Sequence, residues 1–261
     1  MDQIENNTTR SSTEDPVRKR YDAMDKEYWN ELKRLAEKHN LTMQDLICNY
    51  LAFIRRRDLP RLLAHYELFK RIVDLPGSII ELGVFMGSGF FSWANLLETF
   101  CPGDRVRKVF GFDSFEGYTE YNNDTGAQKF VSSFDHKLVS NFELLNELTA
   151  LHNNDNLLRG VERCRLIRGN ISDTVPEFVS ISKGLRLSLL YIDVNLFEPT
   201  KIGLEHLYPL VVPGGIVAFN GYGQSPWEGE AKAIEEYFGR QMPTMRKFPF
   251  STLPSAYFIK D

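Results

Sequence analysis

The chain has 261 residues, of which 43% are hydrophobic and 25% charged, and its formal net charge is −4. This composition is typical of a globular protein with one α/β-sized domain and a small appendage. The weak negative charge creates no field that would attract nucleic acid, and no apolar run approaches the roughly 20 residues that span a bilayer. We therefore expect neither a nucleic-acid partner nor a membrane partner. Cys48, Cys101 and Cys164 lack metal-ligand spacing and are odd in number, which favours reduced thiols and a cytoplasmic location.

The N-terminal part of the chain predicts helices and no strand. Residues 1–20 are polar and of mixed charge, without the apolar core of a signal peptide, and are expected to form a disordered lead-in. Residues 21–75 follow a helical pattern, in which Leu32, Leu35 and Ala36 share one face. We expect these residues to form a helical cap, whose surface could join copies of the chain into a homo-oligomer.

From residue 76 onwards, short apolar runs alternate with amphipathic segments. The runs predict strands at 78–84, 108–114, 164–170, 187–194 and 214–220. The amphipathic segments predict helices at 88–99, 138–152, 173–182, 198–209 and 228–238. This alternation predicts an α/β domain spanning 76–261, with a mainly parallel sheet covered on both faces. Segments 245–250 and 255–260 lie close in sequence and predict an antiparallel hairpin at the sheet edge.

The first predicted strand runs into a glycine-rich turn directly before a helix. Its pattern is Glu81-x-Gly83-x-x-x-Gly87-Ser88-Gly89, which differs from the G-x-G-x-x-G spacing that cradles pyrophosphate. Glycines allow a sharp turn and a close approach to a ligand, and a leading acid suits a ligand with a positively charged amino-acid end. A glycine-rich turn without a ligand is the alternative.

Polar residues also end the next two strands. Asp113 follows Gly89 by 24 residues, about as far on as the acid that binds a ribose diol in dinucleotide folds, although it could equally cap the turn "FDSFEG". In the stretch after the third strand, Asn170 to Ser172 could edge an adenine ring, and Asp173 is a plausible helix N-cap. The polar segment 116–137 is longer than a connection requires and is a candidate functional loop.

The fourth and fifth strands end in Asp193 and in Asn220-Gly221. A carboxylate that leaves a buried strand needs a partner, so Asp193 indicates either a site or a structural ion pair. Asn-Gly is a strong hairpin signal, but the helical pattern at 228–238 leaves no second strand to pair with. Asn220 is therefore expected at the mouth of a site.

Five stretches together resemble class I S-adenosylmethionine-dependent methyltransferases, and more closely the macrocin O-methyltransferase (TylF-type) family of sugar O-methyltransferases. They are "LPGSIIELGVFMGSG", "VFGFDSFEG", "GNISDTVPEF", "YIDVNLFEPTKIGLEHLYPLVVPGGIVAFNGYG" and "WEGEAKAIEEYF". They occur in collinear order over roughly residues 60 to 240, and the second and fourth are distinctive of the narrower family. The resemblance implies a Rossmann-like sheet of seven strands, mostly parallel, with a C-terminal antiparallel hairpin.

The resemblance also implies which residues bind S-adenosylmethionine. Around its methionine part it suggests Glu81, Gly83, Gly87, Ser88 and Gly89. Asp113 and Ser114 are suggested at the ribose, with Asn170 and Ile171 near the adenine. The implied reaction is transfer of a methyl group to a hydroxyl of a sugar-containing small molecule, either a nucleotide-linked deoxysugar or a glycosylated metabolite.

The family generally uses a divalent metal held by acids at the fourth and fifth strand ends, and here the chain departs from the pattern. Asp193 is retained, but asparagine stands at positions 195 and 220 where acids are usual. Mg²⁺ is commonly bound through one or two carboxylates with several waters. We therefore expect either a weak Mg²⁺ site at Asp193 and Asn220, completed by substrate, or no metal at all, with Asp193 as the catalytic base in both cases.

Two other functions stay open at this point. One is methylation of another small hydroxylated acceptor, such as a catechol, which would share the cofactor half of the site. The other is a catalytically impaired cofactor-binding protein with a regulatory or assembly role, which Asn195 and Asn220 favour and Asp193 opposes.

Overall fold

The computed structural model describes residues 16–117, 140–225 and 228–261, with side chains from residue 23 onwards. The chain folds into two compact units, one up to Arg56 and the other from Arg57 to Asp261. Most of the polar segment expected to be a functional loop, 116–137, lies outside the described residues, as do positions 1–15 of the expected lead-in. No helix in the described ranges is long and apolar enough to cross a bilayer.

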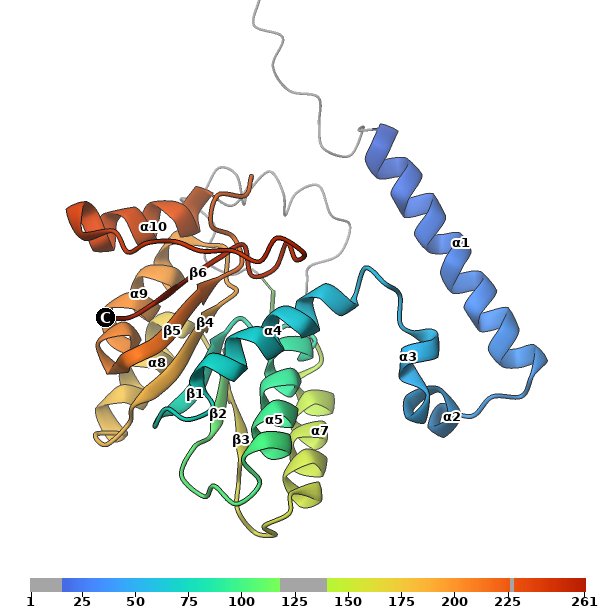
Figure 1. Ribbon diagram of the computed structural model, residues 1–261, viewed down its shortest axis with the longest axis horizontal. Coiled ribbons are helices and arrows are strands. Elements are labelled where there is room, and N and C mark those ends of the chain that lie inside the picture. The colour runs from blue at the N-terminus through green and yellow to red at the C-terminus, as the bar shows by residue number, and fades with distance from the viewer. Residues whose placement is uncertain (1–15, 118–139, 226–227) are drawn as a thin grey trace, which may run out of the picture. The chain divides into compact units, whose positions relative to one another are not determined.

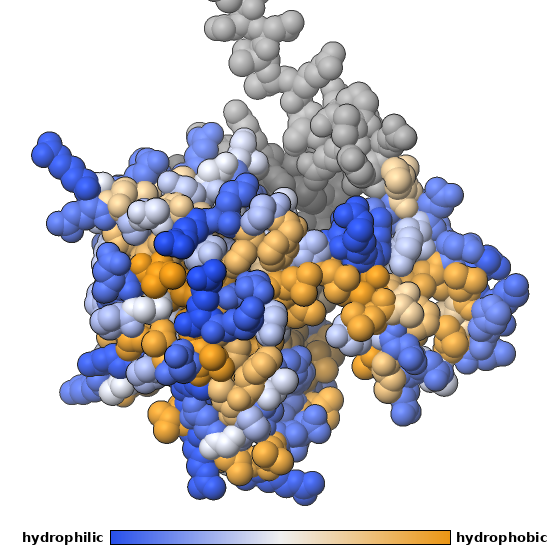
Figure 2. All heavy atoms as spheres, viewed as in Figure 1, coloured by the Kyte–Doolittle hydropathy of each residue, from blue (hydrophilic) through white to orange (hydrophobic). Residues whose placement is uncertain are grey.

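The first unit is helical, as its sequence pattern predicts. It contains α1 (Pro16–Lys38), α2 (Met43–Cys48) and α3 (Tyr50–Phe53), so a helix already begins within the expected lead-in of residues 1–20. Thr42 and Asp45 form a capping box at the start of α2. No side chain described between residues 23 and 56 is buried, and Figure 2 shows apolar side chains on the surface of these helices. The large exposed ones are Met24, Trp29, Leu35, Met43, Ile47, Tyr50 and Leu51. Self-association through these helices stays a prediction.

The second unit is a three-layer α/β/α domain (Figure 1). Its strands are β1 (Ser78–Leu82), β2 (Val109–Asp113), β3 (Cys164–Arg168), β4 (Leu187–Ile192), β5 (Val211–Phe219) and β6 (Ala256–Ile259). Its helices are α4 (Leu59–Ile72), α5 (Ser88–Phe100), α7 (Phe142–Asp155), α8 (Ile171–Ile181), α9 (Phe197–Leu207) and α10 (Glu228–Phe238). Two short 3-10 helices, η1 (Tyr208–Leu210) and η2 (Gly239–Gln241), follow α9 and α10. The helix α4, expected within the cap of residues 21–75, belongs to this unit.

The sheet has the order β3-β2-β1-β4-β5-β6, and only β6 runs antiparallel to its neighbour. The described sheet has six strands, so the expectation of seven is wrong. The segment 245–250, expected as the first arm of a hairpin, makes only an isolated bridge between Arg246 and Tyr257. Pro249 has no N–H to donate to a ladder, and Ser251 N bonds Phe248 O at 3.3 Å in a turn. The segment therefore leaves the sheet after a single pairing.

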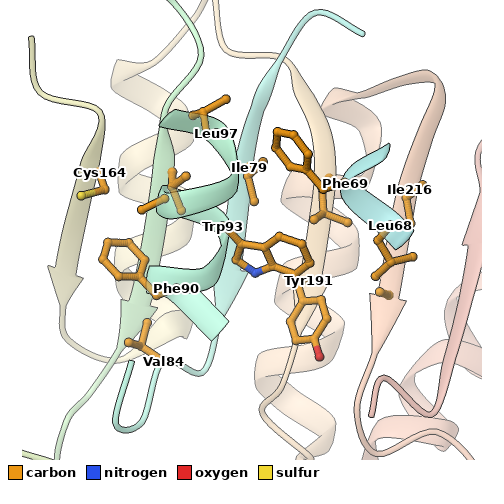
Figure 3. Close-up of a cluster of buried hydrophobic side chains, with 14 of the residues drawn as sticks. Leu68, Phe69, Ile79, Val84, Phe90, Trp93, Leu97, Cys164, Tyr191 and Ile216 are labelled. Carbon is orange, nitrogen blue, oxygen red and sulfur yellow. The ribbon is translucent and has the colours of Figure 1, made fainter. Parts of the chain in front are cut away.

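Alternation along the strands creates two cores. On one face, α4, α5 and α7 pack against side chains such as Ile79 and Tyr191. On the other, α8, α9 and α10 cover Ile80 and Ile192, which are their sequence neighbours. Figure 3 shows Trp93 of α5 between Phe90 and Tyr191 in the first core, with the Tyr191 hydroxyl pointing towards the ends at which the parallel strands finish.

Candidate active site

A pocket of about 270 Å³ opens where the parallel strands end. Its walls come from the loops after β1, β2, β3 and β4 and from the start of α4. The strand order reverses between β1 and β4, and this switch point is where open α/β sheets bind ligands. Six residues suggested from the sequence line the pocket, namely Gly83, Asp113, Ser114, Asn170, Ile171 and Asp193. The other five, which are Glu81, Gly87, Ser88, Gly89 and Asn220, are not among its lining residues.

The glycine-rich turn brings the backbone close to its neighbours. Gly83 and Gly87 have φ values of 88° and 84°, which side chains disfavour. A Cβ at Gly83 would collide with the backbone carbonyl of Asp193, which directly follows the adjacent strand β4. Gly87 is the N-cap of α5, so the turn presents a helix N-terminus beside the pocket. The turn therefore depends on glycine where the sequence has it.

Glu81 lies behind this turn rather than in the pocket. It is fully buried on the same face as Ile79, and its Oε2 accepts a hydrogen bond from Trp93 Nε1 at 2.8 Å. Its Oε1 has no hydrogen-bond partner in the described structure, and a Cβ at Gly89 would strike this carboxylate. Burial raises the pKa of Glu81 to about 8, although the Arg61 charge lowers it.

Asp113 ties together the loops that follow β1 and β2. Its Oδ2 accepts from Phe85 N at 2.8 Å, and its Oδ1 accepts from Phe115 N at 2.7 Å. Both phenylalanines have positive φ, at 49° and 60°, a conformation that bulky side chains rarely adopt. The carboxylate therefore holds two strained loop residues while it lines the pocket. This is the turn-capping role that the sequence offered as an alternative, and it leaves room for a ligand beside the carboxylate.

Asn170 lines the pocket and also caps a helix. Its side chain accepts from Ser172 N at 3.0 Å, and its carbonyl accepts from Thr174 N at 2.9 Å. The helix α8 therefore begins at Ile171, and the suggested N-cap Asp173 lies inside its first turn.

Asp193 forms an ion pair, which the sequence offered as an alternative to a site, and its partner Arg61 was not predicted. Arg61 Nη2 lies 2.9 Å from Asp193 Oδ2, and both residues line the pocket. Their side chains keep 30% and 21% of their surface exposed, so the pair faces the cavity. Burial raises the pKa of Asp193 to about 6, while Arg61 and the Asn220 amide lower it. Asp193 is consequently a carboxylate at neutral pH.

Asn220 belongs to a buried network behind this pair. Its Oδ1 accepts from the Tyr191 hydroxyl at 2.6 Å, and its Nδ2 is buried without a hydrogen bond of normal length. The same hydroxyl lies 3.1 Å from His65 Nε2, and His65 Nδ1 lies 2.6 Å from Ser92 Oγ. Burial and the Arg61 charge lower the pKa of His65 well below its usual value, so this histidine is neutral. The network links α4, α5, β4 and the end of β5.

Glu230 is a second residue that sequence analysis missed. It lies on α10, is fully buried, and accepts hydrogen bonds from Gly221 N at 2.7 Å and Asn195 N at 3.3 Å. Burial raises the pKa of Glu230 to about 8, although these backbone donors lower it. Glu230 thus joins the loops after β4 and β5 from behind the pocket.

The donors around Asp193 do not fit a Mg²⁺ site. Asp193 is paired with Arg61, Asn220 Oδ1 is taken by Tyr191, and the Glu230 oxygens accept backbone hydrogen bonds. Among the described residues, no group of three or more histidine, cysteine or acidic residues could hold a metal ion. The charged residues that line the pocket are Asp113, Asp193 and Arg61, and because Arg61 offsets the charge of Asp193, the net negative charge lies at Asp113, where it suits a positively charged ligand.

Comparison with known proteins adds to this geometry. The family model "Macrocin-O-methyltransferase (TylF)" matches residues 11–244. A tetracenomycin 4'-O-methyltransferase of Streptomyces olivaceus, which acts on 8-demethyl-8-(2,3-dimethoxy-alpha-L-rhamnosyl)-tetracenomycin C, is 30% identical over 167 residues. A demethyldecarbamoylnovobiocin O-methyltransferase of Streptomyces niveus is 28% identical over 166 residues. These matches cover 64% and 63% of this chain, and the chain spans 59% of the length of each relative.

Solved structures agree with the fold. The crystal structure of the calicheamicin methyltransferase CalS11 superposes with a TM-score of 0.81 at 27% identity, covering 90% of this chain and 92% of the other. An apo structure of CalS11, described as a TDP-rhamnose 3'-O-methyltransferase, has a TM-score of 0.77. The match of the family model to most of the sequence, together with this architecture, is decisive. The chain belongs to the macrocin O-methyltransferase (TylF) family.

Proposed function

We propose that this chain is an S-adenosylmethionine-dependent O-methyltransferase that acts on a hydroxyl of a sugar-containing small molecule. One observation carries the proposal: the glycine-rich turn, Asp113 and Asp193 line a single pocket at the strand ends. Membership of the TylF family supports the reaction, and the relatives named above, which act on a rhamnosyl group or on TDP-rhamnose, support the acceptor class.

The cofactor half of the pocket would lie over β1, β2 and β3. Gly83 would let the backbone approach the methionine part, beside the start of α5 at Gly87, Ser88 and Gly89. Asp113 and Ser114 would contact the ribose, and Asn170 and Ile171 would flank the adenine. S-adenosylmethionine supplies a reactive methyl group on a positively charged sulfur when it is bound. The Asp113 carboxylate on the pocket wall, which has no cation paired with it among the lining residues, would favour that charge.

Glu81 would act from behind this half of the site. Its buried Oε1 lacks a partner, and it lies against Gly89 at the start of α5. We propose that it fixes the turn through Trp93 and contributes negative potential whenever it is ionised.

Asp193 would serve as the base. The hydroxyl oxygen would form a C–O bond to the methyl group as the bond between that carbon and the cofactor sulfur breaks, and a neighbouring group must accept the hydroxyl proton. Asp193 lines the pocket and is ionised at neutral pH, so its Oδ atoms can take that proton. The residues around the pocket would otherwise align the acceptor and exclude water.

A direct test is methyl transfer in vitro. The full chain is incubated with S-adenosylmethionine and TDP-rhamnose, and the products are examined by mass spectrometry for one added methyl group. Asp193→Asn should lower turnover by about 100-fold or more, because general bases contribute on that scale. Asp155→Asn, the same change at an exposed residue at the end of α7, is the control and should match the wild type.

The same assay separates the proposal from its alternatives. Transfer to a catechol but not to sugar-containing acceptors would change the acceptor class. Cofactor binding without transfer to any hydroxylated acceptor would favour the catalytically impaired binding protein.

A further inference from the structure

The cation nearest to the proposed base belongs to the protein itself. We propose that the Arg61 guanidinium is the fixed cation of the acceptor site, in the place that a divalent metal would take, and that methyl transfer by this chain needs no metal. This inference rests on the proposed function. The observation behind it is the ion pair between Arg61 Nη2 and Asp193 Oδ2, at 2.9 Å and on the pocket wall.

Few oxygen atoms around the ion pair are available to bind a metal. Mg²⁺ is commonly bound through one or two carboxylates with several waters, and the single carboxylate at the ends of β4 and β5 that faces the pocket in the described structure, Asp193, is already paired with Arg61. Asn220 Oδ1 already accepts a hydrogen bond from the Tyr191 hydroxyl at 2.6 Å, and Glu230 Oε1 accepts one from Gly221 N at 2.7 Å. A metal ion on Asp193 would also meet the positive charge of Arg61, and the two cations would repel each other.

Arg61 is also held in place by the packing of α4 against β4. Arg61 and His65 are four residues apart on α4, while Asp193 and Tyr191 are two residues apart at the end of β4. Four helical residues rise about 6 Å and two strand residues about 6.6 Å, so the two pairs lie in register. His65 is fixed by Tyr191 at 3.1 Å and by stacking on Trp93 at 4.2 Å between ring centroids. The buried pair therefore positions the pocket-facing pair.

Arg61 also has N–H groups that could bind the hydroxyl oxygen of an acceptor. A guanidinium carries five N–H donors, and Asp193 is its only hydrogen-bond partner among the described residues. Part of the side chain is exposed to the pocket, so donors remain for the oxygen of an acceptor hydroxyl. The permanent charge of arginine would stabilise that oxygen as its proton leaves, while Asp193 beside it accepts the proton.

The test measures metal binding directly. Full-length protein is treated with chelator, dialysed and titrated with Mn²⁺, which shares the oxygen ligands of Mg²⁺, and free Mn²⁺ is followed by electron paramagnetic resonance. The wild type should leave the free Mn²⁺ signal unchanged up to millimolar concentrations. Stoichiometric Mn²⁺ binding by the wild type in the micromolar range, lost in Asp193→Asn, would overturn the inference.

A pair of variants tests the role of Arg61 itself. Asn220→Asp adds a second carboxylate and should still bind no Mn²⁺, because Arg61 stays paired with Asp193 and its positive charge repels the metal ion. Combining Asn220→Asp with Arg61→Ala should make Mn²⁺ binding measurable, at concentrations at least tenfold below the highest one at which Asn220→Asp alone binds none. Combining it with Arg71→Ala, an exposed arginine on the same helix, is the control and should change nothing. Equal Mn²⁺ binding with and without Arg61, in variants whose circular dichroism matches the wild type, would contradict the proposal.

A methyl-transfer assay then separates this inference from the proposed function. With chelated enzyme and TDP-rhamnose as the probe acceptor, the rate should be the same with and without Mg²⁺. Arg61→Gln should lower the rate by about 100-fold, because the loss of one hydrogen-bond donor to a developing oxyanion has an effect of that size. Arg61→Lys should lower the rate by less, because lysine keeps the positive charge. A strict requirement for Mg²⁺ would refute the inference but leave the proposed function standing. Failure to methylate any sugar acceptor, with the Mn²⁺ results as expected, would refute the proposed function and leave the exclusion of metal by Arg61 standing.

Discussion

The Tyr191 hydroxyl donates a 2.6 Å hydrogen bond to Asn220 Oδ1, directly behind the pocket. This bond gives the asparagine at the end of β5 a structural task that is separate from metal binding. Tyr191 is fully buried, and burial raises the pKa of its hydroxyl well above the usual value, so the hydroxyl stays neutral and remains a donor. Asn220 thereby connects the end of β5 to the buried His65–Tyr191 pair.

Tyr191→Phe should destabilise the chain. The substitution leaves Asn220 Oδ1 without its donor and removes the partner of His65 Nε2, and buried polar groups left unpaired cost about 1–3 kcal/mol. The measurement is the free energy of unfolding from urea denaturation. Tyr66→Phe is the control, because the Tyr66 hydroxyl makes no hydrogen bond with the described residues, and its effect should stay within about 0.5 kcal/mol. Equal effects of the two variants would show that the network contributes nothing.

Activity should depend on the ionisation of Asp193. The base must be unprotonated, and the pKa of Asp193 is raised to about 6, so kcat/KM should rise as pH increases through about 6 and level off above it. Because the Arg61 charge lowers this pKa, Arg61→Gln should move the rising limb to higher pH. The measurement is the pH profile of kcat/KM for methyl transfer. A profile without a rising limb between about pH 5 and 8 would exclude Asp193 as the base.

Glu81 should make the ligand-free chain less stable as pH rises. Its pKa is raised to about 8 in the fold, against 4.5 in a model compound, so the folded chain binds more protons than the unfolded chain between these values. The free energy of unfolding therefore falls with rising pH in this window, by at most about 1.4 kcal/mol per pH unit for one group. Glu81→Gln removes this dependence, and the variant should gain stability relative to the wild type as pH increases.

Urea denaturation at several pH values measures this difference. Glu177→Gln, at an exposed residue on α8, is the matched control and should follow the wild type at every pH. If Glu81→Gln also runs parallel to the wild type, Glu81 does not carry a raised pKa.

Asp113 should affect both cofactor affinity and stability. Asp113→Ala frees the backbone N–H groups of Phe85 and Phe115, which removes two hydrogen bonds and relaxes two strained loops. We expect S-adenosylmethionine affinity to fall at least tenfold by calorimetry. Asp104→Ala is the control, because Asp104 also accepts two backbone N–H groups, from Val106 and Arg107, in a loop away from the pocket. It should reduce stability without changing affinity, and an equal loss of affinity in both variants would refute a specific role for Asp113.

The parallel sheet and six of the residues that line the pocket were predictable from the sequence, because both follow local patterns. The apolar runs that predict the strands also fix where those strands end, and Asp113, Asn170 and Asp193 follow three neighbouring ends. Parallel strands bring such ends to one edge. The expected seventh strand, at 245–250, does not form. Its segment pairs only at Arg246, and Pro249 has no N–H with which to continue the pairing.

The residues that escaped prediction depend on contacts between distant parts of the chain. Arg61 and Asp193 are 132 residues apart, and nothing in a single sequence pairs them. One signal was present, since Arg61 and His65 share a helix face at i, i+4 spacing. Glu81 was suggested at the pocket, but strand alternation places it with Ile79 against α5, where Trp93 binds it. Alternation within the first strand would have indicated this.

The central claim is that the pocket at the strand ends binds S-adenosylmethionine without a metal. Calorimetric titration of the chelator-treated full chain tests it most directly, at two temperatures so that a small enthalpy at one of them does not hide binding. We expect saturable binding of one equivalent, with the same affinity after Mg²⁺ is added. Binding that is absent at both temperatures, or that develops only after Mg²⁺ is added, would contradict it.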